Sequence, residues 1–111
     1  MNLNETAMMV IMDACTGRDK IDDSLACMGR FEFEKAEELL NEADKSILAA
    51  HVAQTQVIQS QASGEDTEYS LLFIHAQDTL MTAHSELRIA KLLLPIFIAQ
   101  QQEIKRLKKE G

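Results

Sequence analysis

The fold is decided by residues 71–97, which read LLFIHAQDTLMTAHSELRIAKLLLPIF. Apolar or small residues recur here at alternating steps of three and four, the spacing that forms one face of an α-helix. The positions are Phe73, Ala76, Leu80, Ala83, Leu87, Ala90, Leu94 and Phe97, with a further one at Ile104. We predict a helix over about 68–109, kinked near Pro95, because proline removes a backbone donor and crowds the preceding turn.

Two further segments with the same period precede this one. The first, about 4–28, places Leu3, Ala7, Val10, Ala14, Gly17, Ile21, Leu25 and Met28 on one face. The second, about 32–61, does so with Ala36, Leu40, Ala43, Ile47 and Ala50, extended by Val57 and Ile58. Gly29 is a natural residue to end the first helix, and residues 63–66 offer turn and capping chemistry before the third. We therefore predict an all-α protein with one domain over 1–111, an antiparallel three-helix bundle.

Composition narrows the class of protein. The chain carries 18 acidic and 11 basic residues, a net charge of −7, so a nucleic-acid partner is not expected. Cys15 and Cys27 form no Cys-x-x-Cys motif and no export signal precedes them, which indicates reduced thiols in a cytoplasmic protein. The longest apolar stretch, residues 89–99, is interrupted by Lys91 and Pro95 and is too short to span a bilayer. No direct membrane insertion is expected.

The third segment has a second apolar stripe on another face. Its members are Leu71, Ile74, Met81 and Leu92. A helix that is apolar on two faces has two surfaces to bury, so we predict an oligomer closed by cyclic symmetry. Asp78 falls within this stripe. Copies of Asp78 that converge on a symmetry axis would need a cation or shared protons, whereas the alternative is a carboxylate that only faces solvent.

His75 is the candidate functional residue. His75, Asp78, Thr79 and Thr82 stand at i, i+3, i+4 and i+7, so they share one helix face. A neutral imidazole is a nucleophile near physiological pH, and a carboxylate and hydroxyls on the same face can orient it or bind a group attached to it. Spacing alone leaves an ordinary surface histidine as the alternative.

A resemblance to a known family narrows this choice. Residues 74–82, Ile-His-Ala-Gln-Asp-Thr-Leu-Met-Thr, resemble the His-Ala/Gly-Gln-Asp-His-Leu-Met signature of enzyme IIA of the lactose/cellobiose class, in the bacterial phosphoenolpyruvate-dependent sugar phosphotransferase system. Residues 50–55, Ala-His-Val-Ala-Gln-Thr, match that family's Ala-His-x-x-Gln-Thr. Residues 29–31 sit where it has Gly-Asp-Phe, and residues 62–65 fit the loop before its third helix. The likeness covers about residues 20–95, and two spaced motifs are more specific than one.

The resemblance implies a function, an assembly and a set of roles. Such proteins are three-helix subunits of a homotrimer, a nine-helix bundle. The implied phosphotransferase function is that His75 accepts phosphate from the histidine phosphocarrier protein and passes it to a cysteine of enzyme IIB, for uptake of a lactose/cellobiose-type disaccharide. Gln77, Thr79 and Thr82 are expected as hydrogen-bonding neighbours of the phosphohistidine. Asp78 is expected to bind a divalent metal, Mg²⁺ being the expected ion, at the trimer axis.

The chain departs from the family pattern at Thr79, which replaces the second motif histidine. His84 cannot substitute within the same helix, because it lies nine residues beyond His75 and so about 180° around it. The alternative function is a non-catalytic trimeric bundle of the same family that acts as a partner-binding or regulatory protein. His51 is expected to be a buried or interface histidine rather than a catalytic one, since Ile47 and Ile58 flank it on its face. A di-metal carboxylate bundle is excluded, because no histidine has a Glu three residues before it.

Overall fold

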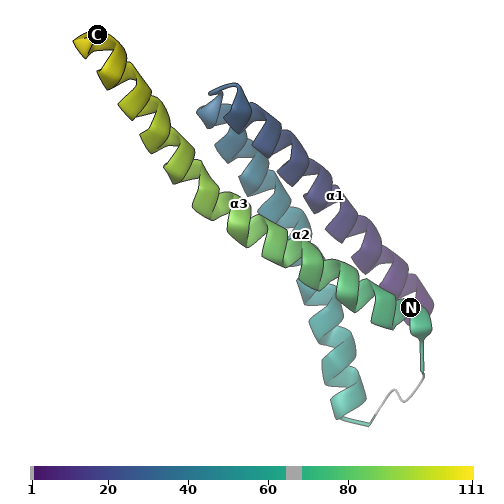
Figure 1. Cartoon of the computed structure of the whole chain (residues 1–111). Helices are drawn as coiled ribbons and strands as arrows, with labels where there is room; N and C mark the ends of the chain where they lie inside the picture. The colour runs from purple at the N-terminus through teal and green to yellow at the C-terminus, as the bar shows by residue number, and fades with distance from the viewer. Residues whose placement is uncertain (1, 65–68) are drawn as a thin grey trace.

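A computed structural model describes residues 2–64 and 69–111. It contains three helices, α1 (Leu3–Gly29), α2 (Phe33–Ala62) and α3 (Leu71–Glu110), and no strand within the described ranges. Helices α1 and α3 run in the same direction and α2 runs against both (Figure 1). The predicted all-α three-helix subunit is therefore confirmed. The predicted start of the third helix, residue 68, lies outside the described residues.

Over the shared length of the three helices, the core lies along the predicted faces. Almost every predicted position in the shared length of the bundle is buried, including the alanines at which the helices approach closely. Leu25 was predicted to be buried and is 38% exposed, so this prediction is wrong. The buried face steps by three from Ile21 to Ser24, which is fully buried. A hydroxyl is tolerated there because Ser24 Oγ donates a hydrogen bond of 2.7 Å to the Ala36 carbonyl oxygen in α2.

This hydrogen bond gives a first testable prediction. Replacing Ser24 with alanine removes the buried donor that links α1 to α2 while adding no bulk. We expect Ser24→Ala to lower the free energy of unfolding by about 1 kcal/mol. Urea denaturation followed by circular dichroism measures it, with Ser85→Ala, which removes an exposed hydroxyl from α3, as the matched control. An effect equal to that of the control would contradict the assignment.

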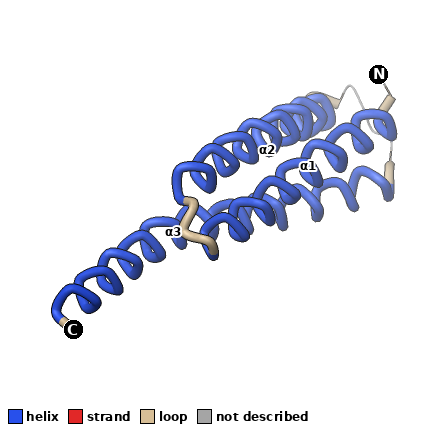
Figure 2. The backbone as a smooth tube through the Cα atoms, turned by 90° about the horizontal axis from the view of Figure 1, so that it is seen from above, coloured by secondary structure: helices blue, strands red, loops and turns tan. Residues whose placement is uncertain are grey.

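The outer ends of the predicted core are exposed. Ile58 of α2 is 43% exposed and Ile104 of α3 is 44% exposed, so both were wrongly predicted to lie in the core. The cause is visible in the outline of the molecule, which measures 68 × 19 × 18 Å. The C-terminal part of α3 extends past the turn between α1 and α2, and the end of α2 leans away from the other helices (Figures 1 and 2). Apolar residues there are only partly covered by the other helices in a single chain.

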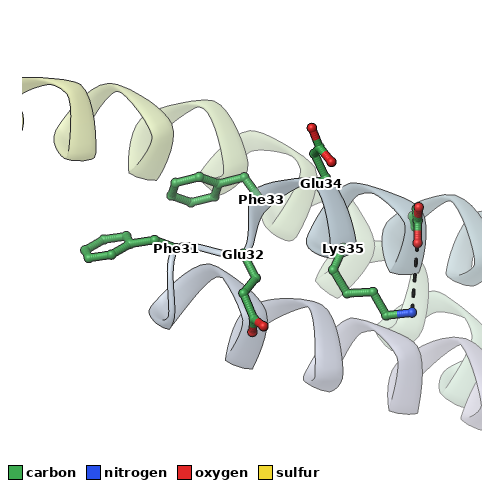
Figure 3. A pocket seen from close by; sticks show the side chains of 6 residues that line it. Phe31, Glu32, Phe33, Glu34 and Lys35 are labelled. Carbon is green, nitrogen blue, oxygen red and sulfur yellow. Dashed lines mark ion pairs between the residues drawn. The ribbon is translucent and has the colours of Figure 1, made fainter.

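The turn between α1 and α2 also differs from the prediction. Gly29 is the last residue of α1, and the left-handed position expected for it is taken by Phe31, with φ 64°. The Glu32 amide donates to the Cys27 carbonyl oxygen at 2.9 Å, which caps the helix end. The rings of Phe31 and Phe33 lie side by side at this turn, their centroids 6.0 Å apart (Figure 3). This aromatic contact helps to offset the cost of a positive φ at a non-glycine residue.

Helix α3, which carries the candidate site, is anchored at its first residues. Ser70 is its N-cap, where its Oγ accepts a hydrogen bond of 3.0 Å from the Phe73 amide. The same oxygen donates to Asn4 Oδ1 at 2.7 Å, which ties the start of α3 to the start of α1. The cap therefore lies beyond the predicted segment 63–66, whose last two residues are outside the described ranges. Helix α3 continues through Pro95, and a bend there stays a prediction.

Candidate functional site

His75 lies on the exposed surface of α3, in the second turn of the helix. Its position follows from the packing of its neighbours, because Phe73 and Ala76 are buried against the rest of the bundle. The backbone that carries His75 is therefore held in place while its imidazole faces outward. This arrangement gives a solvent-accessible imidazole on a well-anchored helix.

The hydroxyls of the two threonines near His75 donate hydrogen bonds to the helix backbone. Thr79 Oγ1 donates to the carbonyl oxygen of His75, and Thr82 Oγ1 donates to that of Asp78, each at 2.9 Å. Serine and threonine often bond back to the preceding turn in this way. Each hydroxyl has a single proton, so Thr79 must first break this bond and rotate before it can donate to a group on the imidazole. The predicted role of Thr79 thus requires a local rearrangement.

Gln77 is half-buried and lies two residues beyond His75. Side chains two positions apart on a helix do not face each other. Gln77 and His75 are therefore not brought together within one chain, and a role for Gln77 at a phosphorylated His75 stays a prediction.

Asp78 is exposed and lies within the predicted second stripe of α3. The apolar members of that stripe are between 42 and 70% exposed in the single chain. They are Leu71, Ile74, Met81 and Leu92. Several exposed apolar side chains along one helix face of a small protein are typical of a surface that is covered by another chain. No group of three or more His, Cys, Asp or Glu side chains that could hold a metal lies in the described part of one chain, so Asp78 belongs to no such group there.

The two remaining histidines lie on another side of the molecule. His51 of α2 and His84 of α3 are both exposed, and both line a cavity of about 270 Å³ between these helices. His51 was predicted to be a buried or interface histidine, and it is not buried within one chain. The buried face of α2 passes from Ile47 to Ala50, so His51 turns away from the core. An interface role for His51 stays a prediction.

The class that the fold defines is that of small all-α proteins built from three long helices, with an exposed histidine on the third. Comparison with known proteins identifies the family. Residues 5–97 match the family described as "PTS system, Lactose/Cellobiose specific IIA subunit". The chain therefore belongs to the lactose/cellobiose-specific IIA family of the phosphotransferase system, as the resemblance predicted.

Individual relatives agree with this assignment. The lactose-specific EIIA component of Staphylococcus epidermidis is 40% identical over 85 residues, which is 74% of this chain and 82% of that protein. The lichenan-specific enzyme IIA component of Bacillus subtilis is 30% identical over 95 residues, 86% of each chain. The crystal structure of the cellobiose-specific enzyme IIA from Bacillus anthracis superimposes with a TM-score of 0.80 at 30% identity, over 100% of this chain and 96% of that one. None of the helices in the described ranges is long and apolar enough to cross a membrane.

The cavity between α2 and α3 was not predicted from the sequence. Two of its lining residues, His51 and Gln54, stand three apart in residues 50–55. Their spacing places both side chains on one helix face, which is the signal that could have revealed it. His84 joins them only through the packing of α3 on α2, and this contact could not be predicted from spacing along one helix.

Proposed function

We propose that this protein is a phosphohistidine carrier that receives phosphate on His75 from the histidine phosphocarrier protein and delivers it to a cysteine of enzyme IIB. The single observation that supports this most directly is the position of His75 in a chain of the IIA family. It is exposed and is the first residue of the family's motif, on a helix with one buried face. The relay would take place in the cytoplasm and serve uptake of a lactose/cellobiose-type disaccharide, which this chain would not contact.

The proposed chemistry needs only the imidazole of His75. A ring nitrogen attacks the phosphorus of the donor's phosphohistidine, a nitrogen–phosphorus bond forms on His75, and the bond in the donor breaks. In the second step a cysteine thiolate of enzyme IIB attacks the same phosphorus and His75 leaves. Such transfer depends on in-line placement of donor and acceptor. Exposure of His75 on an open helix face lets the two partners dock in turn.

We propose that three copies assemble about the exposed stripe of α3 and that Asp78 from each holds one divalent cation on the axis. The support is the chemistry of the donors: a carboxylate within an apolar strip requires neutralisation, and carboxylate oxygens suit Mg²⁺. One chain supplies a single carboxylate, so the site would exist only in the assembly. When bound, the cation would neutralise the charges that convergence brings together.

Replacing Asp78 with leucine tests this assembly. We expect Asp78→Leu to remain trimeric, to lose the axial cation, and to unfold at an equal or higher temperature, because converging charges are replaced by apolar contacts. Sedimentation, metal analysis and thermal unfolding at matched concentration measure the three effects. Asp22→Leu, which removes an exposed carboxylate from α1, is the matched control. A monomeric parent protein would refute the axial arrangement.

A second function is favoured by one observation. Thr79 replaces the family's second motif histidine, and its hydroxyl is bonded to the backbone of His75. Neither feature helps to stabilise a phosphoryl group, which suits a non-catalytic relative that binds partners or has a regulatory role.

Restoring the histidine at position 79 distinguishes a slow phosphate carrier from a non-catalytic relative. If His75 is a slow carrier, Thr79→His should increase the rate of transfer by about 10²-fold or more, the contribution of a positioned acid–base group. Thr82→His, one turn further on, is the control.

The decisive experiment is phosphorylation of the parent protein. It is incubated with phosphoenolpyruvate, enzyme I and the histidine phosphocarrier protein, and its mass is measured before and after brief acid treatment. We expect a gain of one acid-labile phosphate per chain, retained when Cys15 and Cys27 are both replaced by serine. If the parent protein takes up no phosphate, the carrier function is wrong and the non-catalytic function is favoured.

A further inference from the structure

A mostly apolar groove lies where the C-terminal part of α3 passes the turn between α1 and α2. It has a volume of about 430 Å³. One wall is formed by the end of α1 and the turn and the other by α3, with the residues Leu25, Met28, Phe31, Leu93, Phe97 and Ile104. No member of the exposed stripe of α3 lines it. Leu92, the member nearest along the chain, points about 100° away from Leu93 around the helix, so the groove lies on a different face from the proposed assembly.

Several side chains of this groove are exposed although the sequence or the backbone gives a reason to cover them. Leu25 and Ile104 were predicted to lie in the core and are 38% and 44% exposed. Phe31 is 51% exposed, yet it takes a left-handed conformation that a non-glycine residue adopts only at a cost. The rings of Phe31 and Phe33 point away from the bundle, in the direction in which α3 continues (Figure 3). Apolar side chains gathered in this way indicate a surface that another chain covers.

The exposed end of α3 has the pattern of a helix that pairs with another helix. Its apolar side follows steps of four, three, four and three, the spacing of a coiled-coil seam, through Leu93, Phe97, Gln100, Ile104 and Leu107. The first four residues line the groove, and Leu107, which is 54% exposed, continues the same face beyond it. Every residue from 102 to 111 is exposed. A seam of this kind fits the apolar face of one further helix.

The two ends of this surface carry opposite charges. The tip of α3, residues 105–111, has four basic residues and one acidic residue. The end of α1, the turn and the start of α2, residues 22–38, have six acidic residues and two basic ones. Glu34 and Glu38 line a hollow beside Phe31. Because α3 extends past the turn, the basic tip does not meet this acidic region within one chain (Figures 1 and 2). A second copy of the chain offers both charges.

From these observations we propose that the groove of one chain receives the C-terminal end of α3 from a second copy, which lies antiparallel to the first α3. The contact is two-fold symmetric, so the tip of each chain lies against the turn of the other. An antiparallel pair places a basic tip beside an acidic turn, whereas a parallel pair would place two basic tips together. The exposed side chains of Phe31, Ile104 and Leu107 in each chain are covered by the other.

This contact is separate from the one proposed along the stripe of α3. If three copies assemble about the stripe, their three tips emerge from the same end, and two such assemblies meet end to end. If they do not, the contact joins two single chains. Disruption of the contact halves the mass of the particle in both cases. Its failure and the failure of the proposed trimer therefore give different results.

Ile104→Glu tests the apolar part of the contact. We expect this variant to have half the mass of the parent in sedimentation at matched concentration. The contact should weaken by about 100-fold or more, because both copies bring an unpaired carboxylate into an apolar surface. Ile104 is exposed near the end of α3, so the helix content measured by circular dichroism should be unchanged. Ile58→Glu, at a similarly exposed isoleucine of α2 (43%), is the matched control and should keep the parent's mass.

Reversal of charge tests the contact between tip and turn. A tip variant carries Lys108→Glu and Lys109→Glu, and a turn variant carries Glu34→Lys and Glu38→Lys. Each variant alone should pair with itself about tenfold more weakly than the parent does, because like charges now face each other. An equimolar mixture of the two should recover the doubled mass. In the mixed pair each tip again faces a turn of opposite charge.

Two results would overturn the inference. One is that the parent and Ile104→Glu have the same mass at every concentration measured, which would leave the groove to a helix of another protein. The other is that the mixture of tip and turn variants pairs no better than either variant alone, since the tip would then not contact the turn. Neither measurement requires a phosphate donor or a metal.

Discussion

His75→Ala is expected to abolish phosphate uptake completely, down to the background of a protein-free reaction. No other group can take over its role. His84 points to another side of α3, and the cysteines lie on α1, Cys27 being buried. The change removes an exposed side chain from a helix, and alanine favours helix, so folding should be unaffected. Mass spectrometry after incubation with phosphoenolpyruvate and the two donor proteins measures the loss.

Two variants serve as controls for this result. His51→Ala and His84→Ala each remove an exposed imidazole from a helix and should take up one phosphate per chain, as the parent does. Together the three variants distinguish one phosphorylated histidine from general reactivity of histidines. Persistent uptake by His75→Ala, or its loss in both controls, would show that the phosphate sits elsewhere and would disprove the assignment of His75.

Periodic spacing predicted most of this fold correctly because each amphipathic helix must bury its apolar face against the other two. The spacing gave wrong predictions where burial depends on the neighbouring helices and not on the period of one helix. Ser24 is buried and Leu25 is exposed. The serine hydroxyl can be buried because it donates a hydrogen bond to the Ala36 carbonyl oxygen. Ile104 is exposed because α3 is longer than its neighbours. The burial of Ser24 and the exposure of Ile104 both depend on the neighbouring helices, so neither could be read from the residues around it.

In the candidate site, too, some features could be predicted from the sequence and others could not. His75 could be identified from its motif, since exposure on one helix follows from the period of that helix. The hydrogen bond from Thr79 Oγ1 to the His75 carbonyl oxygen could not be predicted, because a threonine hydroxyl on a helix can donate either to the preceding turn or to a partner outside the helix. The cavity of His51, Gln54 and His84 joins two helices that are distant in sequence, and only their packing brings these residues together.

The second large effect is expected at Gly17, where α1 packs tightly against α2. A β-carbon added at Gly17 would lie 2.6 Å from Ile47 Cγ1 and 3.3 Å from the Ala43 carbonyl oxygen. Ile47 is 2% exposed and β-branched, so it has few other rotamers to adopt. Valine adds two more carbons to this contact, and the helices must separate. We expect Gly17→Val to lower the free energy of unfolding by about 3 kcal/mol, the upper part of the range for overpacking.

The melting temperature should fall by about 10–20 °C, as expected for a domain of this size. Gly29→Ala is the matched control: a β-carbon there meets nothing within 4 Å, and alanine favours helix, so stability should stay equal or rise by up to about 1 kcal/mol. Shortening the opposing side chain provides a second check. Ile47→Ala should be far less destabilising in the Gly17→Val background than in the parent, because it makes room for the valine. If Gly17→Val is as stable as Gly29→Ala, the two helices do not approach as closely at Gly17 as described.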